Sequence, residues 1–199
     1  MKYEHQELIH LRFSELLNVI AATLKESGNS IERAALIITE SFLSGNKLLI
    51  CGNGGSAADS QHFAAELLSS FAKGLERKSL PALALTTDSS VLTAYSNDYG
   101  FDGVFERQIS GLGKQNDVLC VISTSGQSQN CIKAAKSARA QGLKVIALTK
   151  INSDLSLLAD CAVEVVSNNT QHIQECHILI IHTIVEIIEN LIIENGHKK

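Results

Sequence analysis

The first pattern of apolar positions along the chain is helical. Residues 4–26 carry leucines and an isoleucine at the spacing of one helix face. The polar run Ser27-Gly28-Asn29-Ser30 interrupts this pattern, and a second helix is predicted from about Ile31 to Leu43, ended by Gly45. The chain is therefore expected to open with two helices that precede the first strand.

Short apolar runs then alternate with helical patterns. Strands are predicted at 47–51, 82–85, 118–122, 145–148 and 162–166, and helices at 56–70, 89–96, 102–111, 128–141, 153–159 and about 170–193. Nearly all-apolar strands separated by helices indicate a parallel sheet covered on both faces. We expect an α/β three-layer sandwich with a five-stranded parallel sheet. A single domain would span residues 1–199, with N-terminal helices in 1–45 and the sheet core and C-terminal helix in 46–194.

Charge and apolarity exclude several classes of partner. The net charge of −4 gives no electrostatic reason to bind nucleic acid or an anionic membrane. The first residues, Met-Lys-Tyr-Glu-His-Gln-Glu, are unlike a signal peptide. The most apolar stretch, 178–193, is short for a membrane span and includes His182, Glu186, Glu189 and Asn190. A buried helix and a cytoplasmic location are expected.

The cysteines have no metal-binding or disulfide spacing. Five occur, without a C-x-x-C pair: Cys51, Cys120, Cys131, Cys161 and Cys176. We expect small buried hydrophobic side chains in a reducing compartment.

A glycine-rich turn follows the first predicted strand. The run Gly52-Asn53-Gly54-Gly55-Ser56 enters a helix, its glycines permit close backbone approach, and Asn53 and Ser56 can donate hydrogen bonds. The frame is not that of a dinucleotide-binding fingerprint, and no P-loop lysine follows. The turn alone fits a ligand site and a structural turn about equally.

A hydroxyl-rich loop follows the third predicted strand. The run Ser123-Thr124-Ser125-Gly126-Gln127-Ser128 enters a helix, where free backbone N–H groups and the helix dipole attract an anion. The alternative is a plain helix cap by Ser128. One cap does not require the hydroxyls of Ser123, Thr124 and Ser125, so a phosphate site is favoured. A third polar segment, Ser96-Asn97-Asp98-Tyr99-Gly100, is interpreted as a loop.

Four side chains on two predicted helices could do chemistry together. His62 and Glu66 are four residues apart, and Gln174 and His182 are eight apart, so each pair shares a helix face. If these faces meet, Glu66 and His182 could act as an acid/base pair, or all four side chains could hold a divalent metal. The alternative is that both histidines are satisfied core or interface residues. A histidine inside the apolar run Ile-Leu-Ile-Ile-His-Thr-Ile favours function, because an unpaired buried titratable group is costly.

The motifs together resemble one family. The runs Gly52-Asn53-Gly54-Gly55-Ser56, Gln61-His62-Phe63-Ala64-Ala65-Glu66-Leu67, Asn97-Asp98-Tyr99-Gly100-Phe101, Ile122-Ser123-Thr124-Ser125-Gly126 and Ile173-Gln174-Glu175, with His177 and His182, are similar to those of the phosphoheptose isomerases of the sugar-isomerase (SIS) fold. The resemblance extends from about residue 5 to 194, in the same order and spacing. It implies a flavodoxin-like SIS domain that converts sedoheptulose 7-phosphate to D-glycero-D-manno-heptose 7-phosphate for lipopolysaccharide heptose.

The resemblance also implies a role for each motif. Phosphate would be bound by Ser123, Thr124, Ser125 and Ser128, and the sugar held or its pocket shaped by Asn53, Gly54, Gly55, Asn97 and Asp98, with Glu66 and Gln174 also in the substrate site. Glu66 would move a proton between C1 and C2, and His182 would assist at the oxygens. An optional Zn²⁺ would be held by His62, Glu66, Gln174 and His182. The family implies a homotetramer with sites at subunit interfaces.

Three segments depart from the family pattern. Ser70 stands where the family usually has an arginine shortly after the glutamate, and His172 stands where an arginine often precedes Ile-Gln-Glu. The run Lys150-Ile151-Asn152-Ser153-Asp154 replaces a glycine-rich loop. These changes affect the expected sugar-chain contacts and leave the acid/base residues in place.

Two functions of other classes compete with the isomerase. A related SIS protein is a non-enzymatic scaffold that binds the replication initiator, and it shares the Gly-Asn-Gly turn and the Ala-Gln-His-Phe-Ala-Ala run. It lacks counterparts of Glu66 and His182, which this chain keeps. A phosphosugar-sensing regulatory domain is disfavoured because no DNA-binding segment is attached.

Overall fold

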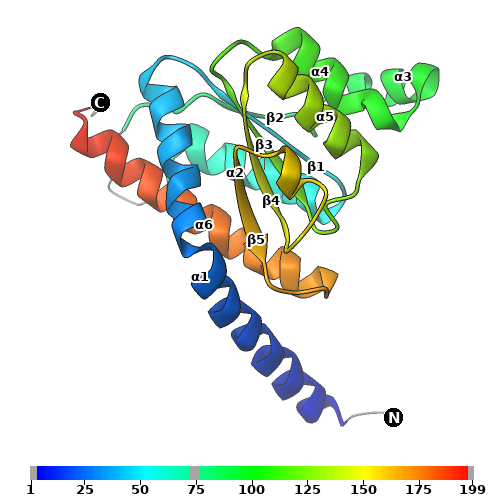
Figure 1. The fold of residues 1–199 in the computed structure, drawn as a ribbon, viewed down its shortest axis with the longest axis vertical. Helices are drawn as coiled ribbons and strands as arrows, with labels where there is room; N and C mark the ends of the chain where they lie inside the picture. Colours follow the sequence, from blue (N-terminus) through cyan, green and yellow to red (C-terminus); the bar gives the residue numbers. More distant parts are fainter. Residues whose placement is uncertain (1–3, 72–76, 197–199) are drawn as a thin grey trace.

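The computed structural model describes residues 4–71 and 77–196, which form alternating helices and strands (Figure 1). The helices are α1 (His5–Leu43), α2 (Gly55–Leu68), α3 (Ser89–Tyr99), α4 (Val104–Leu112), α5 (Gln129–Ala140) and α6 (Thr170–Glu194), with short 3-10 turns η1 (Phe101–Gly103) and η2 (Ser156–Leu158). The strands are β1 (Leu48–Gly52), β2 (Ala82–Ala84), β3 (Val118–Ser123), β4 (Lys144–Lys150) and β5 (Cys161–Val165).

The strands form one parallel sheet in the order β2-β1-β3-β4-β5. β1 and β3 are buried along their whole length, as their apolar sequences require. Residues Leu48 to Gly52 of β1 lie opposite Val118 to Ile122 of β3. The predicted five-stranded parallel sheet is confirmed.

Helices cover both faces of the sheet and create two apolar cores. α1, α2 and α6 pack on one face, with Ala34, Phe63 and Ile181 among the fully buried residues. α4 and α5 pack on the other face, where Phe105 and Ala134 are buried. The predicted three-layer arrangement is confirmed.

The predicted break between two N-terminal helices is wrong, because α1 continues through it from His5 to Leu43. Ser27 lies buried in the middle of this helix, where its hydroxyl donates to the carbonyl of Glu164 at 2.7 Å and accepts from the Glu164 N–H at 3.1 Å. A polar residue that sequence reading treats as a helix breaker is here a tertiary contact to β5. That contact outweighs the weak local helix propensity of the run.

Two other local predictions need correction. Ser96, Asn97, Asp98 and Tyr99 form the last turn of α3 and not a loop, and the helix ends at Gly100 with φ 87°. The helix expected at 153–159 is only the single turn η2. The same residue types, such as Asn, Asp and Gly, are favoured at helix C-termini and in loops, so the sequence does not distinguish the two.

α6 is an apolar helix of the core. By length and composition alone it could cross a membrane, but half of its most apolar window is buried inside the protein. Its buried residues pack against the sheet face also covered by α1 and α2. The prediction of a buried helix is confirmed.

The five cysteines are free and buried, as expected. Burial raises the pKa of Cys176 to about 11, so this thiol is neutral at physiological pH.

Candidate active site

The hydroxyl-rich and glycine-rich loops leave the same edge of the sheet. β1 and β3 are neighbours, with Gly52 opposite Ile122, so residues 53–56 and 124–128 begin side by side. The chain runs from β1 outward to β2 and then returns to β3 on the other side of β1. In open parallel sheets, ligands bind beyond the carboxyl ends of strands at such a reversal of strand order.

The glycine-rich turn is shaped by backbone crowding. A Cβ on Gly52 would lie 2.6 Å from the carbonyl oxygen of Ser56 and 2.8 Å from that of Ile122, both backbone atoms. Gly54 has φ 57°, in the left-handed region. Glycine is therefore required for the turn itself, whatever the loop binds.

Asn53 is held by a residue that sequence reasoning missed. Its amide nitrogen donates to Asn130 Oδ1 at 2.9 Å, and its amide oxygen accepts from Asn130 Nδ2 at 2.8 Å. Asn130 lies in the first turn of α5, two residues after Ser128, and that position was the available signal. Because this reciprocal pair engages both ends of the amide, it connects the glycine-rich turn to the first turn of α5.

The hydroxyl-rich loop folds into a tight turn that is held by two of its own hydroxyls. Ser123 Oγ accepts from the N–H of Gly126 at 3.1 Å, and Ser125 Oγ accepts from that of Gln127 at 3.2 Å. Gly126 has φ 64°, and a Cβ there would overlap Ser153. Ser128 occupies the N-cap position of α5, but its side chain makes no capping hydrogen bond. The alternative interpretation of Ser128 as a plain cap is therefore wrong.

The predicted faces of α2 and α6 meet at three side chains. His62 Nε2 lies 2.8 Å from His182 Nε2 and 3.6 Å from Glu66 Oε1. The side chains of His62 and Glu66 are 40% and 23% exposed, so the cluster is open to a ligand. The ring of Phe71 lies 5.5 Å from that of His182. Two imidazoles and a carboxylate can exchange protons with a substrate placed against them.

Gln174 meets α2 near its first turn. A Cβ on Gly55 would overlap the Gln174 amide. Burial raises the pKa of Asp59, and the nearby side chains of His62 and Gln174 oppose the shift. Asp59 was missed in the sequence, although it stands three residues before His62 and so shares its helix face.

The remaining predicted sugar contacts lie on α3. Asn97 Nδ2 donates to Asp98 Oδ1 at 2.8 Å, and both side chains are exposed at the end of that helix. The structure thus groups His62, Glu66 and His182 in one cluster and the serine loop with Asn53 in another, while Asn97 and Asp98 face solvent.

The donor set suits zinc in kind. Imidazole and carboxylate are usual zinc ligands, and the amide of Gln174 is a rarer one. Within residues 4–71 and 77–196, no three His, Cys, Asp or Glu groups are spaced to hold a metal as they stand. Two nitrogens on one tetrahedral zinc lie about 3.3 Å apart. The rings of His62 and His182, at 2.8 Å, would therefore need to separate slightly.

Two positions that depart from the family pattern have different surroundings. Ser70 is exposed just after α2. His172 is buried on α6, with Nε2 3.8 Å from Glu15 Oε2 on α1. His172 therefore contributes to the contact between α1 and α6.

Comparisons with known proteins agree on one family. The SIS domain family model matches residues 13–150. The chain is 50% identical over 172 residues to a phosphoheptose isomerase of Aliarcobacter butzleri, covering 86% of this chain and 90% of the relative.

Two solved phosphoheptose isomerases share the fold. The Neisseria gonorrhoeae structure superposes with a TM-score of 0.88 at 40% identity, and the Francisella tularensis structure with 0.90 at 36%. Each match covers 94% of this chain and 100% of the solved chain. This chain therefore belongs to the phosphoheptose isomerase family of SIS-domain proteins.

Proposed function

We propose that this chain isomerises sedoheptulose 7-phosphate to D-glycero-D-manno-heptose 7-phosphate in the cytoplasm, for the heptose of lipopolysaccharide. The observation that carries the proposal is the cluster of His62, Glu66 and His182 across α2 and α6. It occurs in a chain 50% identical to a protein named as a phosphoheptose isomerase. Relatives so named favour the enzyme over the replication-initiator scaffold.

Aldose–ketose exchange needs one base for carbon and one acid–base group for oxygen. Glu66 takes the proton from C1 of the ketose, which leaves an enediol-type intermediate, and returns it to C2. His182 accepts the proton of the O1 hydroxyl and gives a proton to O2. Because His62 lies 2.8 Å from His182, one of the two facing nitrogens donates and the other accepts, which fixes the ring tautomers.

The serine loop holds the phosphate. Ser123, Thr124, Ser125 and Ser128 supply hydroxyls beside the N-terminus of α5, where the helix dipole favours a dianion. The Ser128 side chain makes no capping hydrogen bond to α5, and this supports a role for its hydroxyl in binding phosphate.

Zinc is an optional cofactor held by His62, Glu66, Gln174 and His182, one ion per subunit. When bound, it supplies Lewis-acid stabilisation of the charge that develops on the sugar oxygens. The residue types of the cluster support this assignment.

The working enzyme is a homotetramer whose sites lie at subunit interfaces. The cavity beside Gly52, Asn53 and Phe101 has a volume of only about 90 Å³. Small-molecule pockets usually measure about 300–1,000 Å³. A neighbouring subunit would supply the missing walls.

An isomerase assay tests the proposal. Purified protein is given sedoheptulose 7-phosphate in D₂O, with zinc or with a chelator, and aldoheptose phosphate and deuterium at C2 are followed by NMR. We expect turnover that Glu66→Gln and His182→Ala reduce by about 10²-fold or more. The surface variant Glu106→Gln on α4 is the matched control. Folded wild-type protein without turnover under either condition would refute the proposed function.

The phosphate assignment is tested separately. Ser123→Ala combined with Ser128→Ala removes two hydroxyls, so we expect weaker binding of the phosphosugar by calorimetry. Unchanged affinity would show that the loop does not bind phosphate.

A further inference from the structure

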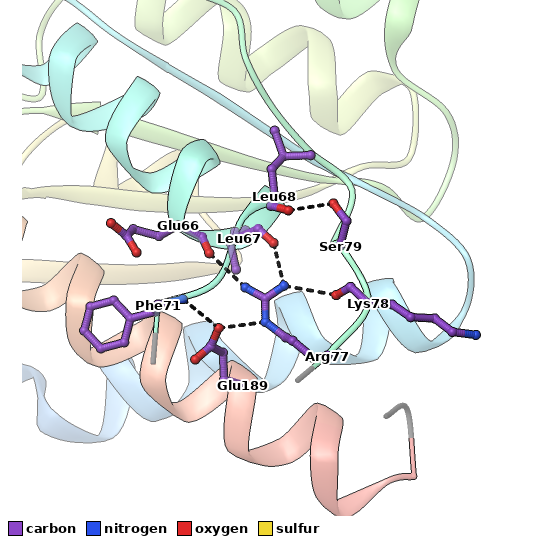
Figure 2. A network of polar contacts seen from close by, with 8 residues as sticks. All are labelled: Glu66, Leu67, Leu68, Phe71, Arg77, Lys78, Ser79 and Glu189. Atoms are coloured by element: carbon purple, nitrogen blue, oxygen red, sulfur yellow. Dashed lines mark hydrogen bonds and ion pairs between the residues drawn. The ribbon is translucent and has the colours of Figure 1, made fainter. Parts of the chain in front are cut away.

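The last turn of α2 is capped by side chains from a separate segment. The final carbonyl groups of a helix have no partner within it. Here Arg77 donates from Nη2 to the carbonyl of Glu66 and from Nη1 to that of Leu67, both at 2.8 Å (Figure 2). Ser79 Oγ donates to the carbonyl of Leu68 at 2.8 Å. The guanidinium group thus holds the backbone of the residue proposed as the base.

Arg77 is itself fixed by a buried carboxylate on α6. Its Nε lies 2.7 Å from Glu189 Oε1, and the two side chains are 0% and 2% exposed. The planar guanidinium presents its donors in a fixed fork, so the ion pair with Glu189 determines where the other two nitrogens point. Figure 2 shows the guanidinium lying between the end of α2 and Glu189.

The same carboxylate is connected to the second catalytic candidate. Glu189 Oε1 accepts from the N–H of Phe71 at 2.9 Å, and the Phe71 ring lies 5.5 Å from the ring of His182. Glu189 also stands seven residues after His182, about two turns along the same stripe of α6. The Arg77–Glu189 ion pair therefore contacts both the end of α2, which carries Glu66, and Phe71, whose ring lies beside His182.

We propose that Arg77 and Glu189 are positioning residues that hold Glu66 and His182 in register for proton transfer. This inference rests on the proposed function. Neither side chain is placed to touch the substrate, and both act through the end of α2 and the Phe71 ring. A buried ion pair contributes little to stability compared with apolar residues of similar volume. Geometry at the site is the property that this pair controls.

The test compares three variants with a control pair. Arg77→Met with Glu189→Leu removes both buried charges, Arg77→Lys keeps the charge without the fork, and Glu189→Gln keeps the shape without the charge. The control, Lys47→Met with Asp117→Asn, removes the ion pair between Lys47 and Asp117 at the opposite, amino-terminal ends of β1 and β3. Measurements are thermal unfolding, kcat and KM, and the ring NMR signals of His182.

We expect the variants that fold to lose about 10-fold to 10²-fold in kcat, with KM changed by less than about threefold, since small displacements of reacting groups have effects of that size. Arg77→Lys should retain more activity than the double variant. The His182 ring signals should shift in the double variant and stay unchanged in the control.

Unchanged kcat and unchanged His182 signals in folded variants would overturn the positioning role. So would an equal loss of kcat in the control, because that would reflect stability alone. An inactive wild type would refute the proposed function but not the positioning role, which would then be judged from the His182 signals.

Discussion

Three histidines of α6 occupy three different environments. His172, His177 and His182 are each five residues apart, so successive side chains point in directions about 140° from one another. His172 faces Glu15 on α1, His182 faces His62 on α2, and His177 is fully buried. Burial lowers the pKa of His177 to about 4, with the backbone of Thr149 opposing the shift. His177 is neutral at physiological pH and takes no part in acid–base chemistry.

Because His177 is buried, we expect the stability of the fold to decrease in acid. The native pKa of about 4 lies below the ordinary value of 6.5, so between these two values the unfolded chain binds more protons than the native one. Stability should therefore fall as the pH drops from 6.5 to 4, by up to roughly 3 kcal/mol from this residue. Urea unfolding of the wild type and of His177→Leu at several pH values measures it.

The His177→Leu variant should lose less stability than the wild type as the pH falls from 6.5 to 4. His5→Leu, at the exposed start of α1, is the matched control and should keep the wild-type slope. Equal slopes in all three proteins would refute the assignment.

Sequence spacing was informative where the partners lie on one helix. The four-residue step from His62 to Glu66 and the eight-residue step from Gln174 to His182 were enough to predict shared faces. Asn130 was missed because its partner Asn53 is 77 positions away. Arg77 was missed for the same reason, since the residue that fixes it is 112 positions away. Long-range pairs leave no local pattern in a single sequence.

At the scale of elements, α1 protects an open edge of the sheet. β5 is an edge strand, and edge strands expose unpaired backbone groups. Ser27 satisfies both the N–H and the carbonyl of Glu164, and Thr23 Oγ1 accepts from the N–H of Val166 at 3.1 Å. Ser27, one of the polar residues that suggested a helix break, thus helps to attach α1 to the sheet.

Removing one of these hydroxyls should destabilise the protein. Ser27→Ala leaves two backbone groups of β5 unsatisfied in a part-buried position, which should cost about 1–3 kcal/mol. Ser14→Ala removes an exposed hydroxyl bonded within the same helix and should cost less than about 0.5 kcal/mol. Urea denaturation compares the two, and equal costs would mean that the contact to β5 contributes nothing.

Element types were predictable and some boundaries were not. The strands appear where short apolar runs stand, because both faces of each central strand are covered. The polar end of α3 was read as a loop because Asn97 and Asp98 favour turns as well as helix ends. The helix here ends only at Gly100, whose φ of 87° lies in the left-handed region that favours glycine.

At the scale of the whole molecule, the N-terminal part of α1, before the residues that pack on the core, projects past the rest of the protein (Figure 1). Phe13 and Leu17 are 70% and 65% exposed, four residues apart on one face. Apolar side chains in such an arrangement are typical of a surface that another subunit covers. This feature supports the proposed tetramer and supplies its test.

Charged substitutions on this face should break the assembly. Phe13→Glu with Leu17→Glu should convert the proposed tetramer into smaller species, as measured by light scattering, and activity should fall with it. Asn18→Glu with Ser14→Glu places two charges at exposed positions of the same helix segment and serves as a control for added charge. A double variant that remains tetrameric would exclude this face from the interface.

The distance in sequence between the two facing imidazoles has a consequence for how the enzyme is made. His62 and His182 are 120 positions apart, and α6 follows all five strands. A nascent chain that already contains the serine loop, the proposed phosphate site, still lacks His182, one of the three side chains of the proposed catalytic cluster. Recovery of turnover after dilution from denaturant therefore requires α6 to pack on α2, in addition to formation of the sheet. Enzymatic activity is thus expected only from a chain that includes α6 in its native position.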